Sequence, residues 1–252
     1  MQNKKRFFLG LLIVLSLFLA GCAGEPAVSA PGVTLTLDPA GGPSQVNTGL
    51  QLLVLMTVLS VAPSILMLAT SFTRIIIVMS LLRNAIGTPQ IPPNQVVIGL
   101  SMLLTFFIMT PVYNKVNTEA LQPYINQEID QETALTRAMS PIRDFMFKQT
   151  REKDLELFLS LSGEARPTTL DDISTVVLMP AFVISELRTS FIMGFSVYIP
   201  FLIIDLVVSS ILLSMGMMML PPSLISLPFK ILLFIMVDGW YLIAGSLARS
   251  FL

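Results

Sequence analysis

Residues 191–222 read FIMGFSVYIPFLIIDLVVSSILLSMGMMMLPP. The part over 191–213 is an apolar run long enough to cross a bilayer as a helix, which takes about 20 residues. Asp205 interrupts the run, and a charge that faces lipid at this depth costs ~3 kcal/mol on insertion scales. We therefore expect a helix whose charged side faces protein rather than lipid.

The end of this stretch predicts a loop, because a glycine, three methionines and two prolines do not suit a helix interior. Met217, Met218 and Met219 would present flexible thioether side chains, which can fill an irregular gap and repack when something passes. In a ring of identical subunits, such loops would converge into a deformable apolar constriction that blocks ions. The simpler alternative is that these methionines pack a hairpin between two membrane helices.

The composition of the whole chain agrees with a membrane location. Its 252 residues are 54% apolar and 12% charged, whereas a soluble domain carries roughly 25% charged residues. The net charge of −1 argues against nucleic acid as a partner. Histidine is absent, which excludes Ser-His-Asp triads and H-E-x-x-H zinc sites. We find no phosphate-binding glycine loop and no cluster of metal ligands, so we expect no cofactor and no metal.

The N-terminus has the layout of a secretory signal peptide over residues 1–24, with a basic start, an apolar run and small residues. Its one cysteine, Cys22, ends a Leu-Ala-Gly-Cys string that resembles a bacterial lipobox. Cys22 is therefore a candidate for lipidation, ordinary signal cleavage is the favoured alternative, and an uncleaved anchor is the third. Residues 25–47 are rich in small and turn-forming residues and predict a flexible linker.

The rest of the chain alternates between hydrophobic and polar regions. Residues 48–114 predict a first hydrophobic helical hairpin, 115–175 a polar helical region, and 176–252 a second hydrophobic half. Four hydrophobic segments follow the leader, at about 50–72, 96–112, 191–213 and 224–247. Arg74 and Arg83 lie between the first two, which puts that connection in the cytoplasm and the polar region on the periplasmic side. The fold class is thus an all-α integral membrane protein.

The polar region predicts two helix starts. Ser140 followed by Pro141 is typical of an N-cap with proline at the first helical position. An amphipathic helix would then run from there to Gly163. Thr169 with Asp172 three residues later resembles the capping box of the next helix.

Several ionisable residues and prolines lie within the second hydrophobic half, which suggests that much of this surface contacts protein. The candidates for a buried or inter-subunit charge network are Arg151, Glu186, Arg188, Asp205, Lys230 and Asp238. Arg151 could reach Glu186 of its own or of a neighbouring copy. Arg74 is either a pore or assembly contact, or a stop-transfer charge that extends to the membrane interface.

Nine short strings of the sequence recur in one known family. They are SFTRIIIV (71–78), LRNAIGTP (82–89), PPNQ (92–95), TFFIM (105–109), QTRE (149–152), SEL (185–187), FLIIDLV (201–207), GMMM (216–219) and VDGW (237–240). Together, and in this order, they resemble the FliP family of flagellar type III export-gate proteins. The resemblance runs from about residue 51 to the C-terminus.

The resemblance implies a bacterial inner-membrane, multi-pass protein of the flagellar basal body that is not an enzyme. Members form a homopentameric ring of kinked helical hairpins, which combines with FliQ and FliR into a helical channel. FlhB and FlhA attach at its cytoplasmic side, and unfolded flagellar proteins pass through as cargo. The resemblance places Met217, Met218 and Met219 at the constriction, and Arg151 and Glu186 at inter-subunit contacts.

Two other functions are alternatives from the residues alone. A secondary transporter of small solutes would use Asp205 and Asp238 as intramembrane proton or ion sites. An intramembrane aspartyl protease would need two facing carboxylates, and neither aspartate has the Gly-x-Gly-Asp context of that class.

Overall fold

The computed structural model describes residues 29–30, 33–34, 43–163, 167, 169–217 and 220–251. The predicted signal peptide, Cys22, and Met218 and Met219 lie outside the described residues, as does most of the predicted linker. By its contacts the chain divides into two units, Met1–Val58 and Leu59–Leu252, with the boundary inside a helix. The first unit contains β1 (Ser29–Ala30) and β2 (Val33–Thr34), which pair antiparallel.

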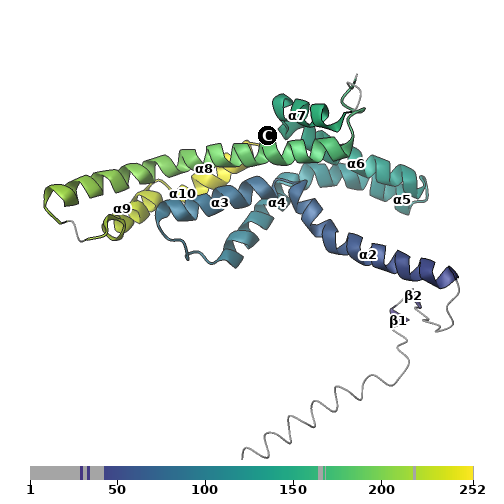
Figure 1. Ribbon diagram of the computed structural model, residues 1–252, viewed down its shortest axis with the longest axis horizontal. Coiled ribbons are helices and arrows are strands. Elements are labelled where there is room, and N and C mark those ends of the chain that lie inside the picture. Colours follow the sequence, from purple (N-terminus) through teal and green to yellow (C-terminus); the bar gives the residue numbers. More distant parts are fainter. Residues whose placement is uncertain are drawn as a thin grey trace, which may run out of the picture. The chain divides into compact units, whose positions relative to one another are not determined.

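Apart from these two short strands, the regular elements in the described parts of the chain are helices. They are α2 (Pro43–Leu68), α3 (Phe72–Ile86), α4 (Asn94–Val116), the π-helix η1 (Asn117–Leu121), α5 (Gln122–Ile125), α6 (Gln131–Gln149), α7 (Glu152–Ser162), α8 (Thr175–Ser214), α9 (Pro222–Met236) and α10 (Gly239–Arg249). Figure 1 shows α8 as the longest of them, with α3 lying along it.

The main core of the second unit forms around α3. Its buried apolar side chains recur at helical spacing, which gives the helix one continuous apolar face. These side chains are Ile75, Val78, Met79, Leu82, Ala85 and Ile86. They pack against residues of α4, α8, α9 and α10, including Val97, Phe201, Phe234 and Leu247. A second cluster joins α4, α6 and α8 through Met109, Phe145, Met146, Leu178 and Phe182.

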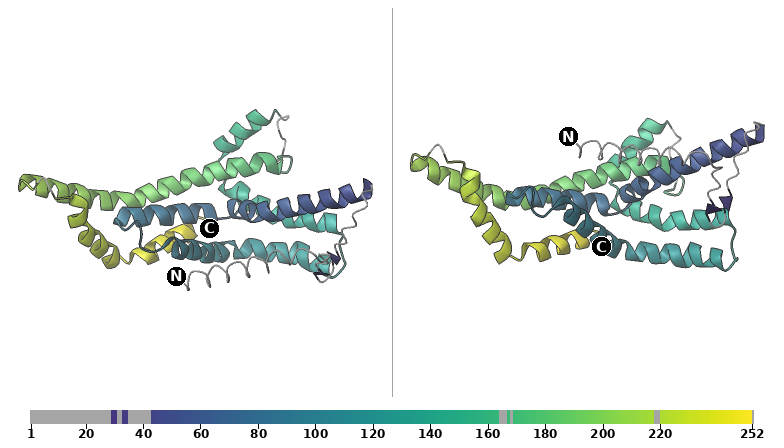
Figure 2. Two further views of the ribbon diagram at one scale, coloured as in Figure 1. Left: turned by 60° about the horizontal axis from the view of Figure 1, so that its bottom comes forward. Right: turned by 90° about the horizontal axis from the view of Figure 1, so that it is seen from below.

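The C-terminal helices form a hairpin with a broken second arm. α8 and α9 are joined by the loop after Ser214, and Figure 2 shows them meeting at one end of α8. The axes of α9 and α10 differ by 62°. Asp238 lies at the break with φ +50°, in the left-handed region that aspartate tolerates better than most residues. The predicted segment 224–247 is therefore bent rather than straight.

Among the described residues, two helical stretches are long and apolar enough to cross a membrane, Asn94–Ile125 and Thr175–Ser214, and α9 with α10 makes a third if the bent pair counts as one span. They contain or coincide with three of the four predicted segments. The first predicted segment, 50–72, is interrupted, because α2 ends at Leu68 and α3 begins at Phe72. An all-helical protein with candidate membrane helices is thus confirmed.

Three helix boundaries in the polar region differ from the predictions. α6 begins after Asp130, whose carboxylate accepts a hydrogen bond from the Thr133 amide, so Pro141 lies inside the helix. Thr150 and Arg151 are not helical, so the single helix predicted from Ser140 to Gly163 is instead divided between α6 and α7. Gly163 does end α7, with φ +69°. Thr169 donates its amide to Asp172 in a turn, and α8 begins six residues later.

Candidate functional site

The centre of the second unit is a polar junction around Arg74. The Nε of Arg74 donates to Oε2 of Glu186 at 2.9 Å, and its Nη2 donates to Oε1 of the same carboxylate. Nη2 also donates to Gln149 Oε1 at 3.0 Å, while Nη1 donates to the carbonyl and the hydroxyl of Ser250, both at 3.0 Å. The ring of Phe251 lies 3.9 Å from the guanidinium carbon. All five N–H donors of Arg74 are therefore used.

Arg74 and its hydrogen-bond partners come from four separate segments. Arg74 lies in the first turn of α3, Gln149 ends α6, Glu186 lies within α8, and Ser250 follows α10. The side chains of Arg74 and Glu186 are 3% and 0% exposed. A buried ion pair of this kind persists only because its remaining hydrogen-bonding groups are also satisfied. The junction consequently fixes how α3, α6 and α8 lie against one another.

A second polar cluster joins α7 to α8 beside this junction. The hydroxyl of Ser185 donates to Oδ2 of the buried Asp154 at 2.5 Å and accepts from the Arg151 amide at 3.1 Å. The Arg151 side chain pairs with Asp154 at 2.5 Å. The Nε of Arg151 is buried without a hydrogen-bond partner among the described residues.

The predicted contact between Arg151 and Glu186 is therefore wrong within one chain. Each residue has another partner, because Asp154 lies one turn from Arg151 on the same helix end and Arg74 occupies both oxygens of Glu186. The contact with a neighbouring copy stays a prediction. Snorkelling of Arg74 to a membrane interface is also wrong, because protein surrounds its guanidinium on all sides.

A third cluster lies where α8, α9 and the end of α3 meet. Lys230 is 5% exposed, and its Nζ donates to Asp205 Oδ2 at 2.6 Å and to the Ala85 carbonyl at 3.2 Å. Ser226 donates to the other oxygen of Asp205 at 2.5 Å. Ala85 is in the last turn of α3, where carbonyls lack partners within the helix and the dipole favours a cation. Lys230 therefore caps α3 while it neutralises Asp205.

The two remaining charges of the predicted network lie at the surface. Arg188 and Asp238 are exposed. Asp238 shapes the break between α9 and α10 with its backbone, and no side-chain capping bond is present there. The residues that the structure describes contain no group of three or more His, Cys, Asp or Glu side chains able to hold a metal ion.

The loop at the end of α8 begins with a tight backbone turn. Gly216 has φ +74°, its amide donates to the Leu213 carbonyl, and the Met217 amide donates to the Leu212 carbonyl. This pair of bonds is the Schellman arrangement, which needs a residue in the left-handed region and so favours glycine. Met215 is 66% exposed and Met217 is 38% exposed. The described part of the loop thus presents thioether side chains at the end of a 40-residue helix.

Sequence reasoning found several charged members of these clusters but not all members or pairings. It placed Asp205 and Lys230 in one charge network, and these two side chains do pair. It did not anticipate Gln149 or Ser250, which lie 75 and 176 residues from Arg74, nor Asp154, whose partner Ser185 lies 31 residues away. One signal was available: Arg74 opens an apolar helix face, a position where a charge needs a buried partner.

The comparison with known protein families gives the identity. The model of the FliP family matches residues 55–247. The chain belongs to the FliP family. The predicted resemblance is thereby confirmed over most of the sequence.

Three relatives illustrate the similarity to the FliP family. Flagellar biosynthetic protein FliP of Bacillus subtilis (strain 168) is 56% identical over 209 residues, which cover 83% of this chain and 95% of the relative. The FliP protein of Pectobacterium carotovorum subsp. carotovorum is 54% identical over 221 residues, covering 88% and 85%. That of Aquifex aeolicus (strain VF5) is 53% identical over 212 residues, covering 83% and 89%.

Membership in the FliP family settles the class of function. The chain is a non-enzymatic component of the flagellar export apparatus and serves flagellum assembly. The three polar clusters accordingly hold helices together, rather than carry out catalysis.

Proposed function

We propose that the chain is a subunit of the channel in the flagellar export gate, through which unfolded flagellar proteins pass. The subunits form a homo-oligomeric ring, pentameric by family resemblance. The observation that carries the proposal is the α8–α9 hairpin: its outer surface is apolar and exposed, Asp205 and Lys230 pair between its two helices, and its connecting sequence is rich in methionine.

The exposed apolar surface of the hairpin needs a covering. Leu206 and Leu213 on α8 are each 60% exposed, and Leu224 on α9 is 66% exposed. Between the two helices lies an apolar groove of about 420 Å³, lined by residues such as Ile203, Val207 and Phe229. Contiguous apolar surface of this kind marks a contact with protein or membrane. Neighbouring subunits of a ring would cover it.

The methionine loop suits the narrowest point of a channel. Thioether side chains on unbranched stems can pack closely when the passage is empty and rearrange around varied polypeptides. The Schellman turn at Gly216 ends α8 abruptly, and Met215 and Met217 on either side of it are exposed. Met218 and Met219, which lie outside the described residues, are included in this proposal with Met217.

The pairing of Asp205 supports a channel subunit over a secondary transporter. Both of its oxygens accept hydrogen bonds, from Lys230 and from Ser226. A proton or ion site needs a carboxylate that is free to bind and release its cargo, whereas this carboxylate joins α8 to α9.

The partners and location follow from the family resemblance. We propose that FliQ and FliR complete the channel, that FlhB and FlhA attach at its cytoplasmic side, and that the assembly lies in the bacterial inner membrane at the flagellar basal body. Arg151 is the better candidate for an inter-subunit contact, because its side chain is 31% exposed whereas that of Glu186 is 0% exposed. Glu186 would have to leave Arg74 to make one.

Permeability measurements test the constriction directly. Replacing Met217, Met218 and Met219 together with alanine should raise ion leakage across the membrane without preventing assembly, because the shorter side chains leave the passage open. Met236→Ala is the matched control, since Met236 is 76% exposed but lies on α9 away from the loop. Unchanged ion permeability in the triple variant would contradict the proposed constriction.

Purification in mild detergent tests the assembly. We expect a ring of several copies together with two small membrane partners. A monomer that takes up a small solute by itself would favour the transporter instead.

A further inference from the structure

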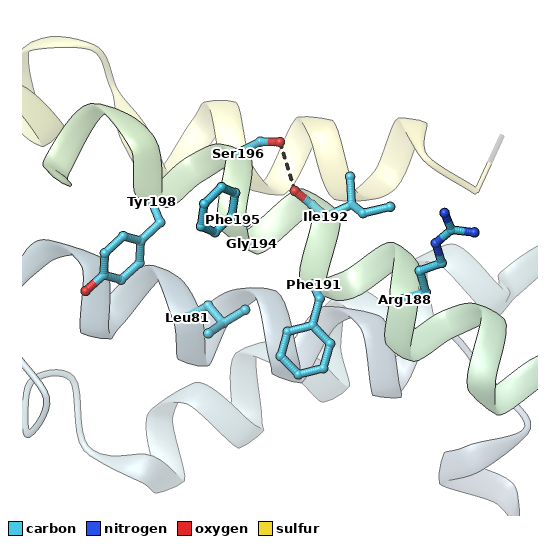
Figure 3. Close-up of a pocket in the computed structure, with 8 residues that line it drawn as sticks. All are labelled: Leu81, Arg188, Phe191, Ile192, Gly194, Phe195, Ser196 and Tyr198. Carbon is cyan, nitrogen blue, oxygen red and sulfur yellow. Dashed lines mark hydrogen bonds between the residues drawn. The ribbon is translucent and has the colours of Figure 1, made fainter. Parts of the chain in front are cut away.

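An open apolar groove lies where α8 crosses α3. It measures about 460 Å³ and is lined by Leu81 of α3 and, on α8, by Arg188, Phe191, Ile192, Gly194, Phe195, Ser196 and Tyr198. Figure 3 shows Arg188 at one end of this set and Tyr198 at the other, with Leu81 and Phe191 between them. None of the three polar clusters uses these residues.

The floor of the groove is held in place by close packing. A Cβ atom built on Gly194 would lie 2.3 Å from Cδ1 of Leu81, so the two helices approach as closely as a glycine allows. Two turns earlier along α8, Glu186 is bound to Arg74 of α3 by two hydrogen bonds. A groove with such a floor exists before any ligand arrives.

Arg188 gives the groove one charged end. It is exposed, and neither a hydrogen bond nor an ion pair is recorded for its side chain among the described residues. The chain that follows it carries no charged residue from 189 to 204. Arg188 therefore lies at the polar end of an apolar stretch, which is the level of the lipid headgroups when α8 crosses a bilayer.

The lining favours an acyl chain over a polypeptide. The hydroxyl of Ser196 donates to the Ile192 carbonyl of its own helix, as Figure 3 shows, so its proton is already used. A bound peptide would bring backbone amides and carbonyls that each need a partner. An acyl chain needs none, and the side walls of Phe191 and Phe195, which are 57% and 65% exposed, offer it apolar surface.

We propose that this groove binds one anionic phospholipid. Its phosphate accepts hydrogen bonds from the Arg188 guanidinium, and one acyl chain lies along Phe191 and Phe195 toward Tyr198. Ten residues of helix separate Arg188 from Tyr198, a rise of about 15 Å, which an acyl chain can follow. The site requires only α3 and α8, and Phe195 lies eleven residues, about three helical turns, before Leu206, where the ring is proposed to cover α8.

Native mass spectrometry of the delipidated full-length protein in detergent tests the proposal. Phosphatidylglycerol, phosphatidylcholine and inorganic phosphate are titrated separately. We expect phosphatidylglycerol to bind more tightly than phosphatidylcholine. Arg188→Gln should weaken phosphatidylglycerol binding about tenfold, which corresponds to the loss of one charge-assisted contact, and should leave phosphatidylcholine binding unchanged. Phe195→Ala should weaken both lipids.

The matched control is Arg249→Gln, since Arg249 is also an exposed arginine on an apolar helix; it should bind phosphatidylglycerol as the unaltered protein does. Circular dichroism verifies that each variant is folded. Equal phosphatidylglycerol binding by Arg188→Gln and the unaltered protein would overturn the proposal. Displacement of the lipid by inorganic phosphate at equal concentration would also overturn it. So would cross-linking of position 195 to a second copy of the chain rather than to lipid.

Discussion

At the scale of single residues, Arg74 satisfies every one of its donors inside the protein. Removing it would leave the carboxylate of Glu186 buried with no cation beside it. We expect Arg74→Met to lower the free energy of unfolding by about 3–5 kcal/mol, the usual cost of breaking a buried ion pair from one side. Denaturant unfolding of the purified protein in detergent measures this.

The double variant Arg74→Met with Glu186→Leu separates charge from packing. Because an apolar pair of similar volume often replaces a buried ion pair at little cost, the double variant should regain much of the lost stability. A double variant no more stable than Arg74→Met alone would show that the hydrogen bonds from Arg74 to Gln149 and Ser250, which both variants lack, matter more than the unpaired charge of Glu186.

Asp130 predicts a pH effect confined to the start of α6. The hydrogen bonds it accepts from Thr133 hold its pKa below the ordinary value of 3.8. The ionised cap thus favours the folded helix above pH 3.8, and this contribution disappears as the pH falls through the lowered pKa. Asp130→Asn keeps a capping side chain that does not titrate.

Amide hydrogen exchange in the first turn of α6, compared between the unaltered protein and Asp130→Asn, measures the contribution of the ionised cap. The ratio of their exchange rates should change only below pH 3.8. A ratio that changes near neutral pH would point to another group.

At the scale of elements, the crossing of α3 and α8 depends on Gly194. Gly194→Ala would place a methyl group against Leu81, and the helices would have to separate. We expect a loss of about 1–3 kcal/mol in the free energy of unfolding, the range for overpacked cores. Loss of swimming motility should accompany it.

Gly245→Ala is the matched control, because nothing lies within 4 Å of a Cβ at that position of α10. It should be neutral or stabilising, since alanine favours a helix over glycine by about 0.5–1 kcal/mol. Adding Leu81→Ala to Gly194→Ala should restore the approach of the helices. Equal effects of the two glycine substitutions would mean that helix propensity, not packing, governs Gly194.

Sequence patterns predicted which segments are helical better than they predicted where each helix begins and ends. The apolar segments are helical as expected, but the predicted span 50–72 does not end just before Arg74. Residues 69–71 separate two helices, and Arg74 lies in the second, where its buried partner is 112 residues away. Pro141 suggested a helix start, yet the Asp130 cap eleven residues earlier begins that helix. A pattern among neighbouring residues cannot indicate a partner that only the tertiary fold brings close.

At the scale of the whole molecule, composition and the nine strings identified the family, and no local motif would have sufficed. The charged candidates were recognised because their residue types are costly in an apolar chain. Their pairings depended on how α3, α6, α7, α8 and α9 pack, which no spacing along the sequence reveals.

The exposed apolar face of α8 gives a prediction for the assembled protein. A benzophenone side chain in place of Leu206 should cross-link to another protein chain of the gate in cells, because a ring would cover this face. Leu161 in α7, which is 71% exposed in the polar region, provides the comparison position. Cross-links from position 206 to lipid alone would contradict the ring.

The junction around Arg74 also sets an order of events during synthesis. Its partners are made 75, 112 and 176 residues after it, so Arg74 is synthesised well before the residues that bind it in the folded protein. Contacts between such distant residues form late and slowly. The junction around Arg74 therefore cannot form completely until α10 and Ser250 have been synthesised. During that interval a chaperone or an assembly partner has its best access to α3.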